Sequence, residues 1–121
     1  MHEKSRSKRG HPLKKPRTHA FKAQGGKCYY CNQPMWMKSE QELTSRYSIT
    51  AKQAKLLQCT GEHLVAHSEG GSSNQMNIAA ACLYCNMNRH RGKKSFTPDR
   101  FQQLARRRLS KGAWHGLKLI H

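Results

Sequence analysis

The sequence is poor in the residues from which large cores and membrane spans are built. Of its 121 residues, 36% are hydrophobic and 7% aromatic, which is too little for a large core. No run of apolar residues approaches the roughly 20 needed to cross a bilayer, so a membrane protein is not expected. The N-terminus is basic but is not followed by the apolar segment of a signal peptide, and we therefore expect a cytoplasmic protein.

Acidic residues are also scarce. Six of them stand against 23 lysines and arginines, giving a formal net charge of +17. This excess goes far beyond what solubility requires and indicates a polyanionic partner. A membrane surface or another acidic partner is the alternative, but no basic helix with a wide apolar face accompanies the charge. We therefore expect the protein to bind nucleic acid.

The N-terminal region carries much of this charge. Residues 1–19 include two prolines and almost no large apolar side chain, so we predict a flexible basic arm. The composition changes from about Ala20, and we assign residues 20–95 to a folded domain and residues 96–121 to a basic C-terminal helix and tail. The basic residues of the arm are Lys4, Arg6, Lys8, Arg9, Lys14, Lys15 and Arg17.

Four of the five cysteines form two identical Cys-x-x-Cys pairs. Two thiolates at this spacing can reach one ion from a tight turn, and two such pairs complete a closed, tetrahedral structural zinc site. Disulfides are disfavoured in a reducing compartment, and a redox site needs only one such pair. The predicted zinc ligands are Cys28, Cys31, Cys82 and Cys85, whereas Cys59 is interpreted as a small buried hydrophobic residue.

The remaining patterns predict short elements around these pairs. Thr50 and Thr97, the second followed by Pro98, are typical helix N-caps. The glycine-containing loop at residues 68–74 separates two apolar stretches that favour strands. The predicted elements are a strand at residues 27–31, a helix at 50–57, strands at 59–65 and 78–81, and helices at 83–91 and from residue 98 onward.

The segment between the cysteine pairs carries further motifs: Glu62-His63, a Gly70-Gly71 loop, Asn77 before the second apolar stretch, and Asn86 directly after Cys85. In this order they resemble the HNH endonuclease domain in its four-cysteine form, over about residues 27–91. The resemblance implies an α+β fold, the small zinc-stapled ββα-metal domain, here with flanking helices and a disordered basic N-terminal arm.

The resemblance also implies roles for single residues. His63 corresponds to the general base that activates water, and Asn77 to the asparagine that orients it. Glu62, where aspartate is more usual in the family, and Asn86 correspond to ligands of a catalytic divalent cation, with His90 a candidate third ligand one helical turn later. Asparagine at position 86 departs from the histidine in the family's name.

The implied activity is metal-dependent hydrolysis of phosphodiester bonds in DNA in a bacterial or phage-like setting. Oxygen ligands suit magnesium or manganese, and a histidine ligand extends the range to nickel, cobalt or zinc. A non-catalytic zinc-ribbon binding module, a nuclease subunit of a larger phage or defence assembly, and a homodimer all remain open. The expected phosphate contacts are Arg89, Arg91, Lys93, Lys94, Arg106, Arg107 and Arg108.

Overall fold

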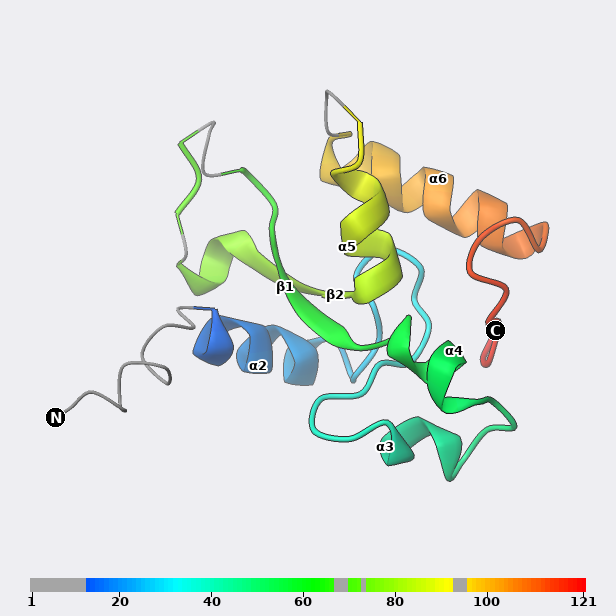
Figure 1. Ribbon diagram of the computed structural model, residues 1–121. Coiled ribbons are helices and arrows are strands. Elements are labelled where there is room, and N and C mark those ends of the chain that lie inside the picture. Colours follow the sequence, from blue (N-terminus) through cyan, green and yellow to red (C-terminus); the bar gives the residue numbers. More distant parts are fainter. Residues whose placement is uncertain (1–12, 67–69, 73, 93–95) are drawn as a thin grey trace, which may run out of the picture.

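The computed structural model describes residues 13–66, 70–72, 74–92 and 96–121. Its centre is a two-stranded antiparallel sheet, in which β1 (Cys59–His63) pairs with β2 (Ile78–Cys82) so that Cys59 lies opposite Cys82 and His63 opposite Ile78. Helix α2 (Lys14–Ala23) packs on this sheet, and α5 (Leu83–Arg89) continues from β2 and packs back on both strands (Figure 1). The expected α+β class with strand, loop, strand and helix is confirmed.

Helix α2 corrects one expectation. Its first residues fall within the range 1–19 that we predicted to be a flexible arm, and that prediction is wrong for residues 14–19. The helix approaches β1 closely at Gly61, where a Cβ atom would lie 3.1 Å from the Leu13 side chain. Packing on the sheet therefore stabilises a segment that its charge alone would leave unfolded. Residues 1–12 lie outside the described part of the chain.

The free edge of β2 is covered by residues that precede the sheet in sequence. The Ala80 carbonyl accepts hydrogen bonds from the Tyr29 backbone N–H (2.9 Å) and the Gln24 side-chain amide (2.9 Å), and the Ala80 N–H donates to the Gln24 Oε1 atom (3.0 Å). All five residues of β2 are buried. The predicted strand at 27–31 is instead a turn, with a single bridge between Lys27 and Pro34.

Several predicted helices form with the expected caps. The Thr50 hydroxyl oxygen and the Gln53 side chain make a reciprocal capping box at the start of α4 (Ala51–Lys55). Thr97 caps α6 (Pro98–Ser110), whose buried face includes Phe101. The short helices α3 (Gln41–Thr44) and η2 (Gln75–Asn77), which is a single 3-10 turn, were not predicted.

The core lies between α6, the turn at residues 28–31 and the sheet. Phe101 on α6 packs edge-to-face against Tyr30, with ring centroids 5.0 Å apart, and both rings are fully buried. Trp36 donates its indole N–H to the Ala54 carbonyl at 2.7 Å, which fixes α4 to the same core. This packing holds the two cysteine pairs against each other, and it places the end of β1 beside α5 (Figure 1).

Candidate metal centre and nuclease site

The two cysteine pairs meet in a buried cluster. The Sγ atoms of Cys28, Cys31, Cys82 and Cys85 all lie within 4.8 Å of one another, and none of these cysteines is in a disulfide. The Cys31 and Cys82 sulfur atoms are 3.9 Å apart. Tetrahedral zinc with Zn–S distances of about 2.3 Å gives sulfur–sulfur separations of about 3.8 Å. The cluster therefore fits one structural metal ion, as the spacing predicted.

The surroundings of the thiols are those of a metal centre. Hydrogen bonds from the Cys28 and Cys82 thiols lower the pKa of Cys31, whereas burial raises the pKa of Cys82 and of Cys85. The backbone N–H groups of Tyr30 and Cys82 both point at the Cys28 sulfur, each at 3.3 Å. Four crowded thiolates repel one another, so a divalent cation at their centre would stabilise the ionised cluster.

Residues 113–120, here called the C-terminal strap, also contact the cluster. Trp114 donates its indole N–H to the Cys85 sulfur at 3.3 Å. His115 Nδ1 accepts the Leu117 backbone N–H at 3.0 Å, so the ring proton lies on Nε2, which donates to the Cys31 sulfur at 3.4 Å. The strap thus supplies one N–H···S hydrogen bond to each cysteine pair, a role that the sequence did not reveal.

We expect these two hydrogen bonds to slow metal release, because partners of metal ligands typically change affinity by about 10-fold to 100-fold. Trp114→Phe and His115→Phe should each transfer zinc to a chromogenic chelator about tenfold faster than the wild type. Lys118→Ala, at an exposed position of the same strap, is the control. Unchanged release in both variants would show that the strap only covers the cluster.

At the other end of the sheet, Asn77 organises the loop that follows His63. Its side-chain oxygen accepts the Val65 N–H at 2.8 Å, and its amide nitrogen donates to the carbonyls of Val65 (3.0 Å) and Ser72 (2.7 Å). Gly71 passes so close to the Val65 carbonyl that a Cβ atom would lie 1.7 Å from that oxygen, so only glycine fits there. Asn77 therefore fixes the backbone two residues beyond His63.

Glu62 lies in the same region but is buried. Its side chain is 2% exposed, and its Oε2 atom accepts a 2.7 Å hydrogen bond from the Tyr30 hydroxyl and forms an ion pair with Arg89. Burial and the Glu62 carboxylate both raise the pKa of Tyr30 far above its ordinary value, so that the hydroxyl remains a proton donor. Tyr30 is a site residue that the sequence analysis missed.

Two side chains, one from α5 and one from the residue that follows it, complete this region. His90 Nε2, directly after the helix, lies 3.0 Å from Glu62 Oε1 and 3.2 Å from Oε2. Asn86 donates its amide N–H groups to the Thr60 hydroxyl (2.9 Å) and the Gly61 carbonyl (3.2 Å) on β1. The structure thus brings Glu62 and His90 into contact and places Asn86 across from the same strand.

The basic residues expected to contact phosphate have different surroundings. Arg89, an expected phosphate contact, is only 4% exposed, and its guanidinium donates to protein groups. Arg106 donates to the Tyr30 carbonyl at 2.9 Å. Arg91, Arg107 and Arg108 are exposed. Lys93 and Lys94 lie outside the described residues.

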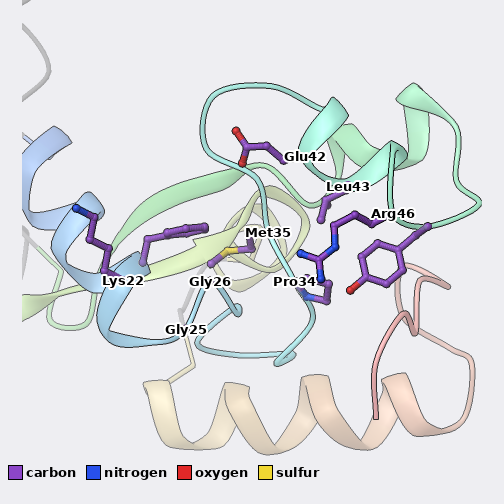
Figure 2. Close-up of a pocket in the computed structure, with 10 residues that line it drawn as sticks. Lys22, Gly25, Gly26, Pro34, Met35, Glu42, Leu43 and Arg46 are labelled. Carbon is purple, nitrogen blue, oxygen red and sulfur yellow. The ribbon is translucent and has the colours of Figure 1, made fainter.

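The described residues also line several cavities. One, of about 240 Å³, lies beside Arg89 and is lined by Leu64, Val65, Ala66, Arg89, Phe96, Thr97 and Pro98. A larger one, of about 530 Å³, lies between the end of α2 and α3 and has the buried side chains of Met35 and Leu43 in its wall (Figure 2). It contains none of the predicted site residues, whereas the smaller cavity is lined by Arg89 and by Leu64 and Val65, which follow His63.

Comparison with known proteins supports this description. The family model "HNH endonuclease" matches residues 49–92, which hold α4, both strands, the second cysteine pair and α5. Neither a search of curated proteins nor a search of solved structures gave a match. Within the described residues, no helix is long and apolar enough to span a bilayer. Residues 49–92 are therefore similar to the HNH endonuclease family, and a cluster of four cysteines that could hold a metal ion joins this segment to the rest of the fold.

Proposed function

We propose that the protein is a metal-dependent endonuclease that hydrolyses phosphodiester bonds in DNA. One observation carries the proposal. Within residues 49–92, which match the family model, Glu62 near the end of β1 and His90 directly after α5 come together, and the carboxylate lies 3.0 Å from the imidazole. Glu62 is also the residue directly before His63 in the sequence. A carboxylate, two imidazoles and a basic surface are the groups that hydrolysis of a phosphodiester requires.

In this proposal His63 is the general base. His63 is half-buried at the end of a strand, and an imidazole is the side chain that most often serves as a general base. Asn77 supports this role through the backbone, because its side chain holds Val65, two residues after His63, at both its N–H and its carbonyl. These bonds fix the start of the loop that follows His63, which is the proposed base.

Glu62, Asn86 and His90 are the proposed ligands of a catalytic divalent cation. Their donor set, one carboxylate, one amide and one imidazole, fits such an ion, and the contact between Glu62 and His90 supports the proposal that these two side chains share it. Magnesium or manganese would supply charge stabilisation at the phosphate. The imidazole favours manganese, nickel, cobalt or zinc over magnesium, because nitrogen ligands suit those ions better.

The charge of the chain supports a nucleic-acid substrate. The net charge of +17 attracts a polyanion, and the side chains of Arg91, Arg107 and Arg108 are exposed. Together with Lys93 and Lys94 they are the proposed phosphate contacts. Arg106, which is also exposed, belongs to the same proposed set. For Arg89 the bonds to backbone carbonyls support a structural role.

The test is nicking of supercoiled plasmid by zinc-loaded protein after addition of Mg²⁺ or Mn²⁺, stopped by a chelator of the labile ion. We expect conversion of supercoiled to open-circular DNA only when the cation is present. A matched RNA substrate tests the nucleic-acid class. Binding of DNA without any nicking, at all metals, would favour a non-catalytic binding module and overturn the proposal.

Binding should depend steeply on salt, because each phosphate contact releases counterions and adds about 0.9 to the slope of log affinity against log salt. Deleting residues 1–12, which include Lys4, Arg6, Lys8 and Arg9, should flatten this slope. A longer deletion would cut into α2, which packs on the sheet. Equal slopes for the full and shortened chains, measured by fluorescence anisotropy, would remove the N-terminus from the interface.

A further inference from the structure

The buried carboxylate of Glu62 is held by two side chains from different parts of the chain. Tyr30 reaches it from the turn of the first cysteine pair, and Arg89 from the last turn of α5. All three residues are nearly inaccessible to solvent, with exposures between 0% and 4%. A carboxylate buried to this extent requires a countercharge and hydrogen-bond donors, and this pair supplies both to the same oxygen, Oε2.

The position of Tyr30 depends on the cysteine cluster. Tyr30 lies between Cys28 and Cys31, and its own backbone N–H points at the Cys28 sulfur at 3.3 Å. Its ring packs edge-to-face on Phe101, and its carbonyl accepts a hydrogen bond from Arg106. The turn at residues 28–31 therefore positions the Tyr30 hydroxyl at Glu62 and also contains the thiols of Cys28 and Cys31.

Arg89 holds more than the carboxylate. Its guanidinium also donates to the carbonyls of His63 (3.0 Å), Leu64 (3.3 Å) and Phe96 (2.9 Å). One side chain thus connects the end of β1, which carries His63, to α5 and to the segment leading into α6. Lysine could preserve the charge but not this planar set of donors.

We propose that Tyr30 and Arg89 are positioning residues that fix Glu62 for the catalytic cation and couple the structural metal cluster to the nuclease site. Both bind Oε2, whereas Oε1 is the oxygen nearer to His90 Nε2, at 3.0 Å against 3.2 Å for Oε2. Tyr30 and Arg89 therefore hold the Glu62 carboxylate in one orientation, with Oε1 closest to His90. This inference rests on the proposed function, because it assigns Glu62 to the site of the labile ion.

The test removes one hydroxyl. Tyr30→Phe keeps the buried ring and the backbone of the turn but deletes the bond to Glu62, and Tyr29→Phe, at the neighbouring position, is the matched control. Zinc-loaded variants are titrated with Mn²⁺ and followed by electron paramagnetic resonance, with Glu62→Gln identifying the signal of the site. Zinc content and melting temperature are measured in parallel.

We expect Tyr30→Phe to bind Mn²⁺ about tenfold more weakly than the wild type, the lower end of the range for partners of metal ligands. The metal concentration for half-maximal nicking should rise by the same factor, with zinc content unchanged and Tyr29→Phe like the wild type. Arg89→Lys should show a larger shift, because it loses the planar donor set as well.

The outcomes separate this inference from the proposed function. If the wild type nicks DNA and Tyr30→Phe has the same Mn²⁺ affinity and metal requirement, the inference is overturned and the nuclease assignment stands. If the wild type binds Mn²⁺ at Glu62 without nicking, the nuclease assignment fails and the binding titration alone decides the inference. A wild type that neither nicks nor binds Mn²⁺ at Glu62 overturns both.

Discussion

Replacing Cys85 with serine is expected to unfold the protein. The cluster joins the turn at residues 28–31 to the junction of β2 and α5, and all four sulfur atoms are buried. Structural zinc sites contribute apparent binding free energies of about 10–16 kcal/mol, as large as the whole stability of about 5–15 kcal/mol of a typical domain. With 36% hydrophobic residues, little remains to hold the fold once the metal is lost.

Circular dichroism and elemental analysis check this expectation. Cys85→Ser, and wild type stripped by a strong chelator, should lose the cooperative thermal transition and the bound zinc together. Cys59→Ala is the matched control, because Cys59 is buried in β1 outside the cluster, where burial raises the pKa of its thiol to about 12 and keeps it neutral. A Cys85→Ser protein that stays folded without zinc would show that the hydrophobic core alone suffices.

The elements with local signals were predictable from the sequence. Thr50 and Thr97 predicted the starts of two helices, and both residues cap those helices in the structure. The spacing of the cysteines predicted a cluster, and the four cysteines do come together in the fold. Boundaries shifted by one or two residues: β1 ends at His63 and α5 at Arg89. Caps and cysteine spacings depend on residues that are close in the sequence, so they can be recognised without knowledge of the tertiary structure.

Features set by distant contacts were not predictable. Helix α2 has the composition of a flexible arm, and it is the close approach of Leu13 to Gly61 that places it on the sheet. Arg89 and Arg91 look alike in the sequence, yet the first is buried with Glu62 and the second exposed. Arg89 lies in the last turn of α5 and bonds to the end of β1, whereas Arg91 lies beyond the helix, and this difference is set by the packing of α5 on the strand.

The same reasoning explains why Tyr30, Trp114 and His115 were missed. Tyr29 and Tyr30 are adjacent and chemically identical, but the turn sends only the Tyr30 hydroxyl to Glu62. Trp114 and His115 lie far from the cysteines in sequence and reach the sulfur atoms through the C-terminal strap. An aromatic residue between two metal-binding cysteines is a weak sequence signal for a positioning role, because the turn at residues 28–31 fixes the direction of its side chain.

His63→Ala is expected to abolish nicking while leaving the rest of the protein intact. General acid–base catalysis by a positioned side chain contributes about 10²-fold to 10⁴-fold, and the imidazole in this proposal acts on the attacking water and carries little of the DNA affinity. The backbone of His63 pairs with Ile78 and its carbonyl accepts a hydrogen bond from Arg89. Alanine retains both backbone features, so zinc content and melting temperature should stay near the wild type.

The measurement is the rate of plasmid nicking at saturating cation, with DNA affinity determined separately by anisotropy. His121→Ala, at an exposed position at the end of the chain, is the matched histidine control and should nick at the wild-type rate. Added imidazole should restore part of the activity of His63→Ala, because a small base can enter the space left by the side chain, whereas it should not restore Glu62→Gln. A wild-type rate in His63→Ala would remove the general base from the mechanism and shift the search for it to the other histidines, beginning with His90, which already contacts Glu62.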